Sequence, residues 1–430
     1  MQRLLLSIIA LISLFCSLTA QERTDSLTPG ADADGGPLIV SIVTCDPGPD
    51  VYELCGHAAL RIRNEKMDSV WNYGIFDFSS PNFLYRFCKG QTDYMVCGYE
   101  FQRFMPTYMR RGSKVTEQVL DLTQEEARRL RAIVQTEALP QNRIYRYNYV
   151  LDNCATRPWK RVGEATDRPI EMPDTFHFTT FRKEMRHFHR NYPWYQFGID
   201  LALGKGIDQP IGRDRDIFAP PVLAAKLAET TIGGQPIVKE TNVIYPGEGD
   251  VTLPPTPWYL TPTFVGLLML LLSLGLLIKA SLAGKDTPDE GPHSARIGFF
   301  TKLWISAYFL LCAIGGCIIT FLVFCSEHEA TSPNWIILWL NPLQIIPALG
   351  VWWKSWRWPL IVMSVYDWFV GLYMFSVFIC RYIVPVSVYF SLGGQIANPA
   401  ILFMSLSLVP LSSIMLAKLK TSPAHKPKRL

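Results

Sequence analysis

A cysteine at the expected start of a helix is the residue in this chain best placed for nucleophilic chemistry. Residues 149–157 read Tyr-Val-Leu-Asp-Asn-Cys-Ala-Thr-Arg, and the aromatic and apolar run 147–151 is typical of an extended segment. Asp152 and Asn153 are residue types that cap helices, so we expect Cys154 in the first helical turn. Backbone N–H groups at a helix N-terminus favour a thiolate over a thiol. Cys154 is therefore a candidate nucleophile.

A histidine and an asparagine upstream supply the other two groups of a thiol site. His57 directly precedes the stretch 58–63, whose last part alternates polar and apolar residues as a half-exposed strand does. A turn leads into a second predicted strand, 69–76, which carries Asn72. Because antiparallel pairing brings the two side chains together, we expect His57 to act as the base and Asn72 to orient its imidazole. The rivals for the orienting role are Tyr73, Asp77 and Asp152.

The second half of the chain has the composition of a membrane domain. The chain has 430 residues, of which 49% are hydrophobic, and a formal net charge of +4. No basic run is interleaved with aromatic residues, so nucleic acid is not an expected partner. A bilayer core requires about 20 apolar residues per helix. The sequence predicts about five spans, of which the third is interrupted by prolines, at 258–280, 303–325, 335–353, 359–384 and 396–417.

The charge pattern orients these spans. Lys and Arg gather in the loops after spans one and three and in the tail after span five, and such loops face the cytoplasm. Residues 1–20 have the basic start and apolar run of a secretory signal. Both arguments place the first half outside the cytoplasm. The predicted parts are a signal peptide (1–20), a periplasmic thiol-enzyme domain (21–245), a linker (246–257), transmembrane helices (258–417) and a basic cytoplasmic tail (418–430).

The outer domain is predicted to be α+β. Strands are expected at 38–44, 58–63, 69–76, 93–99, 114–122 and 237–245, and helices at 81–89, 101–111, 124–139, 179–190, 193–203 and 220–231. An extracytoplasmic location favours disulfides. Two disulfides among Cys45, Cys55, Cys88 and Cys97 would leave Cys154 free, although the sequence does not give their connectivity.

Other polar residues have simpler interpretations. The remaining outer-domain histidines, His177, His187 and His189, lie in a polar, aromatic stretch and are expected at the surface. No Cys/His cluster has zinc-ligand spacing, and no cofactor is expected. An acid within the fourth span, Asp367, is either a functional residue or a polar contact between helices.

Three motifs in this order resemble the Lnb-type lipoprotein N-acyltransferases. They are Tyr-Glu-Leu-Cys-Gly-His-Ala-Ala-Leu-Arg at 52–61, Asn-Tyr-Gly-Ile-Phe-Asp-Phe at 72–78 and Asp-Asn-Cys-Ala-Thr-Arg at 152–157. The resemblance continues through Asp-x-x-Leu-Gly at 200–204 and Phe-x-Pro at 218–220 into the membrane half. More broadly, a histidine on a strand before a cysteine at a helix start resembles permuted NlpC/P60-like, papain-like thiol enzymes. A cysteine at position 55 departs from the expected apolar or small residue.

The resemblance implies an inner-membrane enzyme with a periplasmic active site and an all-α transmembrane bundle. Cys154 would take an acyl chain from a phospholipid and pass it, through a thioester, to the α-amine of a diacylated lipoprotein cysteine. Further substrate contacts are expected at Arg61, Tyr73, Asp77, Asn153 and Arg157. Two rival functions remain, namely a membrane-anchored thiol peptidase or amidase acting on cell-wall peptide, and a non-catalytic membrane module.

Overall fold

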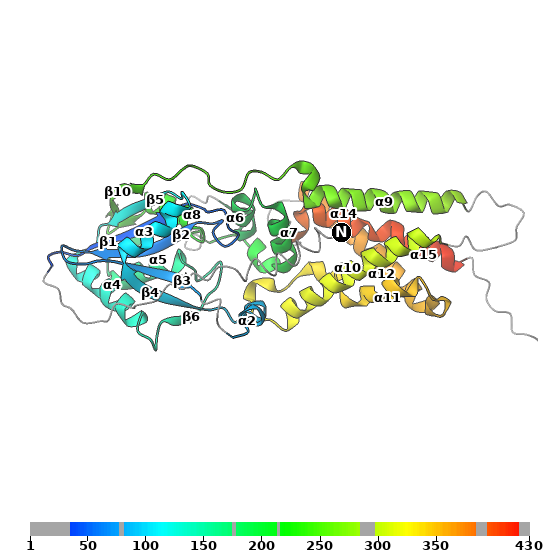
Figure 1. Cartoon of the computed structure of the whole chain (residues 1–430), viewed down its shortest axis with the longest axis horizontal. Coiled ribbons are helices and arrows are strands. Elements are labelled where there is room, and N and C mark those ends of the chain that lie inside the picture. Colours follow the sequence, from blue (N-terminus) through cyan, green and yellow to red (C-terminus); the bar gives the residue numbers. More distant parts are fainter. Residues whose placement is uncertain are drawn as a thin grey trace, which may run out of the picture. The chain divides into compact units, whose positions relative to one another are not determined.

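The computed structural model describes most of the chain as two compact units (Figure 1). The first unit comprises Met1–Phe178 and Ile211–Thr252, and the second comprises Thr179–Pro210 and Leu253–Leu430. The predicted signal peptide, Asp77, His177 and the tail beyond residue 420 lie outside the described residues. The described residues are 35–76, 81–173, 178–212, 216–283, 297–383 and 394–420.

A seven-stranded antiparallel sheet forms the centre of the first unit, with strand order β10-β5-β1-β2-β3-β4-β6. Its strands are β1 (Ile39–Cys45), β2 (His57–Arg63), β3 (Asp68–Ile75), β4 (Asp93–Glu100), β5 (Val115–Leu120), β6 (Ile144–Arg146) and β10 (Val238–Tyr245). A smaller sheet contains β7 (Ile170–Glu171), β8 (Thr231–Ile232) and β9 (Gln235–Pro236).

Both faces of the large sheet are covered because its central strands are apolar on both sides. In β1, Ile42 packs into one buried cluster and its neighbour Val43 into another. The first cluster is completed by α4 (Gln124–Glu137), α5 (Thr156–Ala165) and α8 (Pro220–Leu227), and the second by α3 (Phe101–Arg110). The α+β prediction is therefore confirmed.

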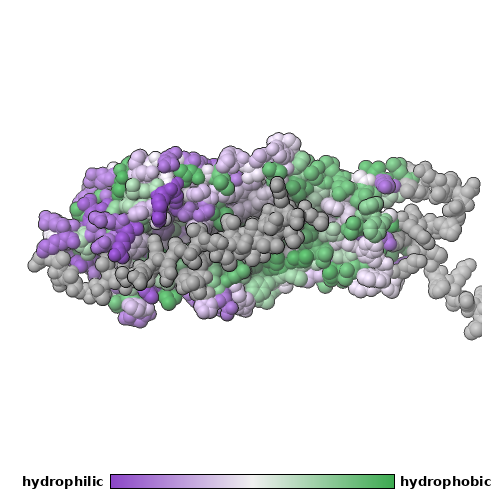
Figure 2. All heavy atoms as spheres, viewed as in Figure 1, coloured by the Kyte–Doolittle hydropathy of each residue, from purple (hydrophilic) through white to green (hydrophobic). Residues whose placement is uncertain are grey.

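The second unit is helical, and its described residues include four helices that are long and apolar enough to cross a membrane. These spans are Pro262–Leu282 in α9, Phe299–Phe324 in α10, Arg357–Cys380 in α12, and Pro399–Ala417 in α14 and α15. Their surface is largely hydrophobic, whereas that of the first unit carries many hydrophilic residues (Figure 2). Hydrophobic side chains at the surface of such helices suit contact with lipid.

The third of the five predicted spans, the one interrupted by prolines, is not a single long helix, and the shorter apolar helical stretch Trp335–Gly350 lies at its position. In its place the chain forms η6 (Trp335–Leu338), η7 (Pro342–Gln344) and α11 (Ile345–Gly350). Pro342 interrupts the run because proline lacks the N–H that a continuous helix needs. Asp367 in α12 is fully buried and accepts hydrogen bonds from Gln344 (2.9 Å) and Ser412 (3.3 Å), so it forms a polar contact between elements.

The segment Thr179–Pro210 belongs to the helical unit, although the predicted division at residue 245 places it in the outer domain. It forms α6 (Phe181–Phe188), α7 (Pro193–Ala202) and η2 (Lys205–Asp208). His189 follows α6 and is fully buried, so the surface location expected for it is wrong. Its Nδ1 lies 2.8 Å from Oε1 of Gln196, and this hydrogen bond permits the burial.

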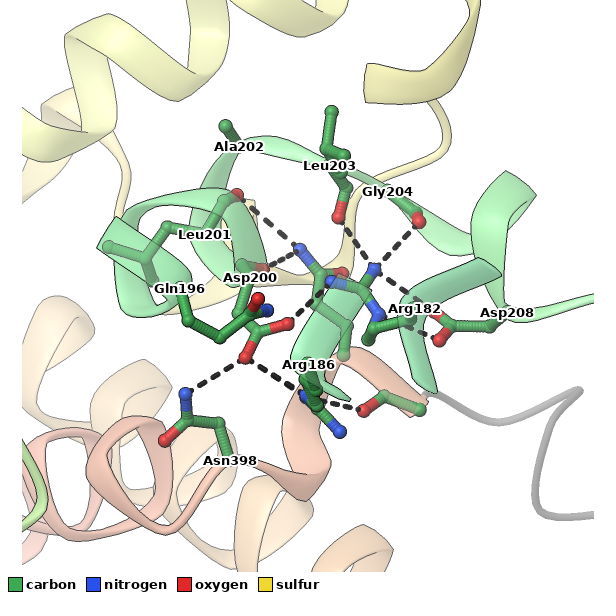
Figure 3. A network of polar contacts seen from close by, with 12 residues as sticks. Arg182, Arg186, Gln196, Asp200, Leu201, Ala202, Leu203, Gly204, Asp208 and Asn398 are labelled. Carbon is green, nitrogen blue, oxygen red and sulfur yellow. Dashed lines mark hydrogen bonds and ion pairs between the residues drawn. The ribbon is translucent and has the colours of Figure 1, made fainter. Parts of the chain in front are cut away.

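A buried arginine joins the parts of this segment (Figure 3). The Arg182 guanidinium donates to Asp200 (2.9 Å) and to Asp208 (2.7 Å). It also donates to the carbonyls of Leu203 (2.8 Å) and Gly204 (2.9 Å). All three charged side chains are at most 1% exposed, and such burial is tolerated only where each charge has partners.

Polar side chains from distant loops bind the same segment. Asp200 also accepts from Asn398 (2.9 Å), and Gln395 donates to the Asp200 carbonyl (3.0 Å). Asn334 donates to the Leu201 carbonyl (2.9 Å). A Cβ on Gly204 would lie 2.3 Å from a backbone oxygen of residue 333, so only glycine fits this close approach. The segment is thus built into the helical unit by specific hydrogen bonds.

Candidate active site

The β2–β3 pairing brings His57 and Asn72 together. The antiparallel register places Ala59 opposite Asn72, and His57 lies two positions before Ala59 on the same face of the sheet. His57 and Asn72 are therefore diagonal neighbours, which lie within reach of each other. His57 Nε2 is 2.5 Å from Asn72 Oδ1. The contact is the one predicted from the two strands.

The Asn72 contact selects the imidazole tautomer. Because the amide oxygen only accepts hydrogen bonds, Nε2 carries the proton and Nδ1 keeps a lone pair. Asn72 Nδ2 in turn donates to the hydroxyl of Tyr99 on β4 (2.8 Å), which holds the amide in this orientation. The imidazole also stacks on Tyr108 of α3, with ring centroids 6.3 Å apart and an interplanar angle of 14°. The ring is thus fixed with Nδ1 as the acceptor.

Cys154 lies in the turn that immediately precedes α5 rather than inside the first helical turn, where it was expected. Asn153 builds this turn, because its Oδ1 accepts from the N–H groups of Ala155 (2.8 Å) and Thr156 (3.0 Å). Its Nδ2 donates to the carbonyls of Tyr149 and Phe218, both at 2.9 Å. The polar atoms of Asn153 are therefore committed to holding the cysteine in place.

The cysteine turn packs against the strands that carry His57 and Asn72. The Ala58 N–H and the Tyr147 side chain both lower the pKa of the Cys154 thiol, and Ala155 shares a buried apolar cluster with Ala58. Ala58 is the residue next to His57, so the cysteine turn lies against the histidine strand. Gly74 on β3 has a φ of +90°, and a Cβ there would meet Tyr147 at 3.1 Å and the Cys154 Cβ at 3.9 Å. A glycine at this position lets the turn approach the sheet.

Burial keeps both reactive groups neutral in the resting protein. Burial raises the pKa of the Cys154 thiol to about 11, although the Ala58 N–H and Tyr147 oppose it. Burial also lowers the pKa of His57 to about 4; the Asn72 hydrogen bond opposes this shift and the Arg111 charge adds to it. The result differs from the thiolate expected at a helix N-terminus, because the loss of solvation is larger than the stabilisation by N–H groups.

We expect the rate at which iodoacetamide alkylates Cys154 to depend on pH as it does for a thiol that is neutral at pH 7. With a pKa of about 11, the thiolate fraction at pH 7 is about one in ten thousand, and it rises about tenfold per pH unit. The alkylation rate, measured by peptide mass spectrometry, should therefore keep rising up to about pH 10. The exposed Cys88 in the same sample is the internal control for reagent access. A rate that is already level at pH 7 would instead indicate a preformed thiolate–imidazolium pair.

The other predicted contact residues are engaged within the first unit. Arg61 donates to Asp68 (2.7 and 2.6 Å) and to Glu117 (3.0 Å). Arg157 donates to Asp152 (2.9 and 2.5 Å). Asp152, an alternative candidate for orienting the imidazole, is therefore paired with this arginine. The hydroxyl of the buried Tyr73 donates to Glu137 (2.7 Å). Among Asn72, Tyr73 and Asp152, the described candidates for orienting the imidazole, Asn72 is the residue hydrogen-bonded to it.

The nine cysteines in the described part of the chain are all free thiols. The disulfides that an extracytoplasmic location favours are therefore not formed among Cys45, Cys55, Cys88 and Cys97. Cys55 is buried, and its sulfur lies 3.4 Å from the Tyr149 hydroxyl. No group of three His, Cys, Asp or Glu side chains among the described residues is arranged to hold a metal ion.

Sequence comparisons identify both halves of the chain. The model of the Lnb N-terminal periplasmic domain matches residues 32–182, which include His57, Asn72 and Cys154. The model of the Lnb transmembrane domain matches residues 294–422, which include three of the four spanning helices. The comparisons with curated proteins and with solved structures found no significant match.

Proposed function

Because this chain belongs to the Lnb family, whose domains mark membrane proteins of lipoprotein biogenesis, we propose that it is a lipoprotein N-acyltransferase. Its acyl donor is a membrane phospholipid, and its acceptor is the α-amine of a diacylated lipoprotein cysteine. The observation that carries the proposal is the arrangement of Cys154, His57 and Asn72. The cysteine turn packs against the strand that begins with His57, since Ala155 and Ala58 share a buried cluster, and Asn72 orients the imidazole.

The first half-reaction forms a thioester. His57 Nδ1 takes the thiol proton while the Cys154 sulfur attacks an ester carbonyl of the phospholipid. When the ester C–O bond breaks, His57 returns this proton to the departing glycerol oxygen, and lysophospholipid leaves. A histidine with a lowered pKa is neutral at pH 7 and is therefore ready to accept the proton. The Ala58 N–H stabilises negative charge as it develops on the sulfur.

The second half-reaction forms an amide. The neutral α-amine of the lipoprotein attacks the thioester carbonyl, and His57 accepts a proton from the attacking nitrogen. The C–S bond breaks, and the sulfur regains a proton from His57 as the triacylated lipoprotein leaves. The same base thus serves both steps, as in other enzymes with a covalent intermediate.

The membrane half supports a substrate that resides in a bilayer. The described part of the chain has four helices able to span a membrane, whereas a single anchor would suffice for an enzyme that acts on cell-wall peptide. A phospholipid and a diacylated lipoprotein both reach the enzyme by diffusion within the membrane. We therefore place the protein in the inner membrane, with its N-terminal domain in the periplasm.

The test uses the purified full-length protein in vesicles that contain phospholipid with an isotope-labelled acyl chain. Without an acceptor, the labelled chain should accumulate on the protein as an adduct that hydroxylamine releases. Addition of a synthetic diacylated lipopeptide should move the label to its amino terminus. A lipopeptide with an acetylated α-amine is the matched control, and it should leave the adduct unchanged. Cleavage of cell-wall peptide without any acyl adduct would support the amidase and contradict the acyltransferase.

A further inference from the structure

Helix α2 (Phe83–Lys89) presents apolar side chains on the outside of the first unit. Its sequence is Phe-Leu-Tyr-Arg-Phe-Cys-Lys, and none of its residues is buried. Leu84 is 49% exposed, Tyr85 60% and Phe87 39%. A surface helix of a soluble domain normally turns a polar face to solvent, and a contiguous apolar patch marks a site of contact with a protein or a membrane.

The inner side of α2 continues into a row of stacked rings. The ring centroids of Phe83 and Phe76, which directly follows β3, lie 6.1 Å apart, and the two rings are inclined by 20°. Phe76 stacks on Tyr94 of β4 at 4.8 Å, and Tyr94 packs on Tyr147 at 4.6 Å. We call Phe83, Phe76, Tyr94 and Tyr147 the aromatic row. It connects residues that are up to 71 positions apart in sequence.

The aromatic row ends at the candidate nucleophile. A Cβ on Gly74 would lie 3.1 Å from the Tyr147 ring and 3.9 Å from the Cys154 Cβ, so the last ring of the row lies beside the cysteine. The first unit therefore has a continuous series of aromatic side chains between its exposed apolar helix and its buried thiol. Apolar and aromatic walls with few polar groups are what an acyl chain requires of its binding site.

The membrane is the partner that best fits the exposed face of α2. The described chain has four membrane-spanning helices, so a bilayer is always close to the first unit. The first unit's last strand ends at Tyr245 and α9 begins at Pro262, so the 16 intervening residues reach at most about 55 Å. Aromatic and leucine side chains next to basic residues, here Lys89 and Arg86, which also pairs with Asp93 (2.7 Å), are the composition of elements that lie in a lipid headgroup region.

We propose that α2 lies in the periplasmic leaflet, with its exposed face among the acyl chains of membrane lipid. We further infer that the aromatic row guides the donor acyl chain from this leaflet to Cys154. This second part rests on the proposed acyltransferase function, whereas the membrane contact of α2 does not. The location of α2 explains how a buried thiol reaches an ester that does not leave the bilayer.

Fluorescence quenching tests the membrane contact. An environment-sensitive fluorophore is attached to the exposed Cys88 of α2 in full-length protein in vesicles, with Cys317, Cys325 and Cys380 replaced by serine. The control carries Cys88→Ser and Val243→Cys, because Val243 is 54% exposed on β10 at the opposite edge of the sheet. Phospholipids with brominated acyl chains should quench the Cys88 probe, and aqueous iodide should quench the Val243 probe. Quenching of the Cys88 probe by iodide alone would overturn the proposal.

A charge substitution tests the path of the acyl chain. Leu84→Glu should lower the yield of hydroxylamine-sensitive acyl adduct from vesicle phospholipid by about tenfold. Transfer of an apolar side chain of this size from water to lipid changes the equilibrium constant for membrane contact by about a factor of ten. Val243→Glu is the matched control and should retain the wild-type yield. An equal yield from Leu84→Glu would overturn the role of α2 in acyl delivery. If the wild-type protein forms no adduct at all, the acyltransferase fails, and the quenching result still decides whether α2 contacts lipid.

Discussion

Lipoprotein N-termini should remain diacylated in cells whose sole copy of this protein carries Cys154→Ser. The proposed site loses its nucleophile. In enzymes whose nucleophile and general base act together, removal of the nucleophile lowers the catalytic rate by about four orders of magnitude or more. A serine hydroxyl is far less acidic than a thiol. Proton transfer to His57 is therefore much less favourable from a serine than from the cysteine. Mass spectrometry of lipoprotein N-terminal peptides measures the outcome directly.

The matched control for this substitution is Cys55→Ser. Cys55 is a second buried thiol of the first unit, two residues before His57, and its sulfur lies 3.4 Å from the Tyr149 hydroxyl in the cysteine turn. Serine preserves that hydrogen bond, so N-acylation should continue. Persisting N-acylation in Cys154→Ser would contradict the proposed nucleophile. Loss of N-acylation in Cys55→Ser, with Cys154→Ser unaffected, would move the role to Cys55.

The arrangement of the candidate site was predictable where it depends on short-range pairing. His57 and Asn72 lie on adjacent strands joined by a tight turn, so an antiparallel register is enough to place them together. The packing of the cysteine turn against the His57 strand joins positions far apart in the chain, and only the residue types of a Cys–His site suggested that the two belong together. Tyr99 was missed because a tyrosine in a strand has no distinguishing signal until the β3–β4 pairing is known.

The predicted substrate contacts depend on partners that no local pattern identifies. Arg61 is neutralised by Glu117 from β5, 56 positions away, and Arg157 by Asp152 and by Glu137 from α4. An arginine in a motif suggests phosphate binding only while its partners are unknown. The neutral state of the Cys154 thiol also depends on distant parts of the chain. Its burial results from the packing of the whole unit, and this burial outweighs the local effect of a helix terminus on its pKa.

The helices of residues 179–210 were predictable, but their place in the helical unit was not. Hydropathy finds helices that face lipid, whereas α6 and α7 join the second unit through polar groups. Their partners Asn334, Gln395 and Asn398 lie 132 or more positions away. A sequence pattern with the period of one helix carries no information about such contacts.

Replacing Arg182 by methionine should destabilise the helical unit by about 3–5 kcal/mol, because removal of one partner leaves a buried charge without compensation. Asp200 would keep Arg186 and Asn398, but Asp208 would lose both of its bonds to the guanidinium. The Leu203 and Gly204 carbonyls would lose their donor. Thermal unfolding in detergent should shift by about 10 °C for a unit of this size. Tryptophan fluorescence reports on this unit, which contains every tryptophan except Trp71 and Trp159.

Two further variants separate the buried network from charge in general. Arg129→Met removes an ion pair with Asp167 that is solvent-exposed, so its unfolding temperature should match that of the wild type. Asp208→Leu combined with Arg182→Met should recover part of the lost stability, because the carboxylate left unpaired by the single change is gone. Burial already raises the pKa of Asp208 against the opposing charge of Arg182, so in Arg182→Met this carboxylate protonates, which limits the loss. Equal stability of Arg182→Met and the wild type would show that the network does not hold Thr179–Pro210 in the helical unit.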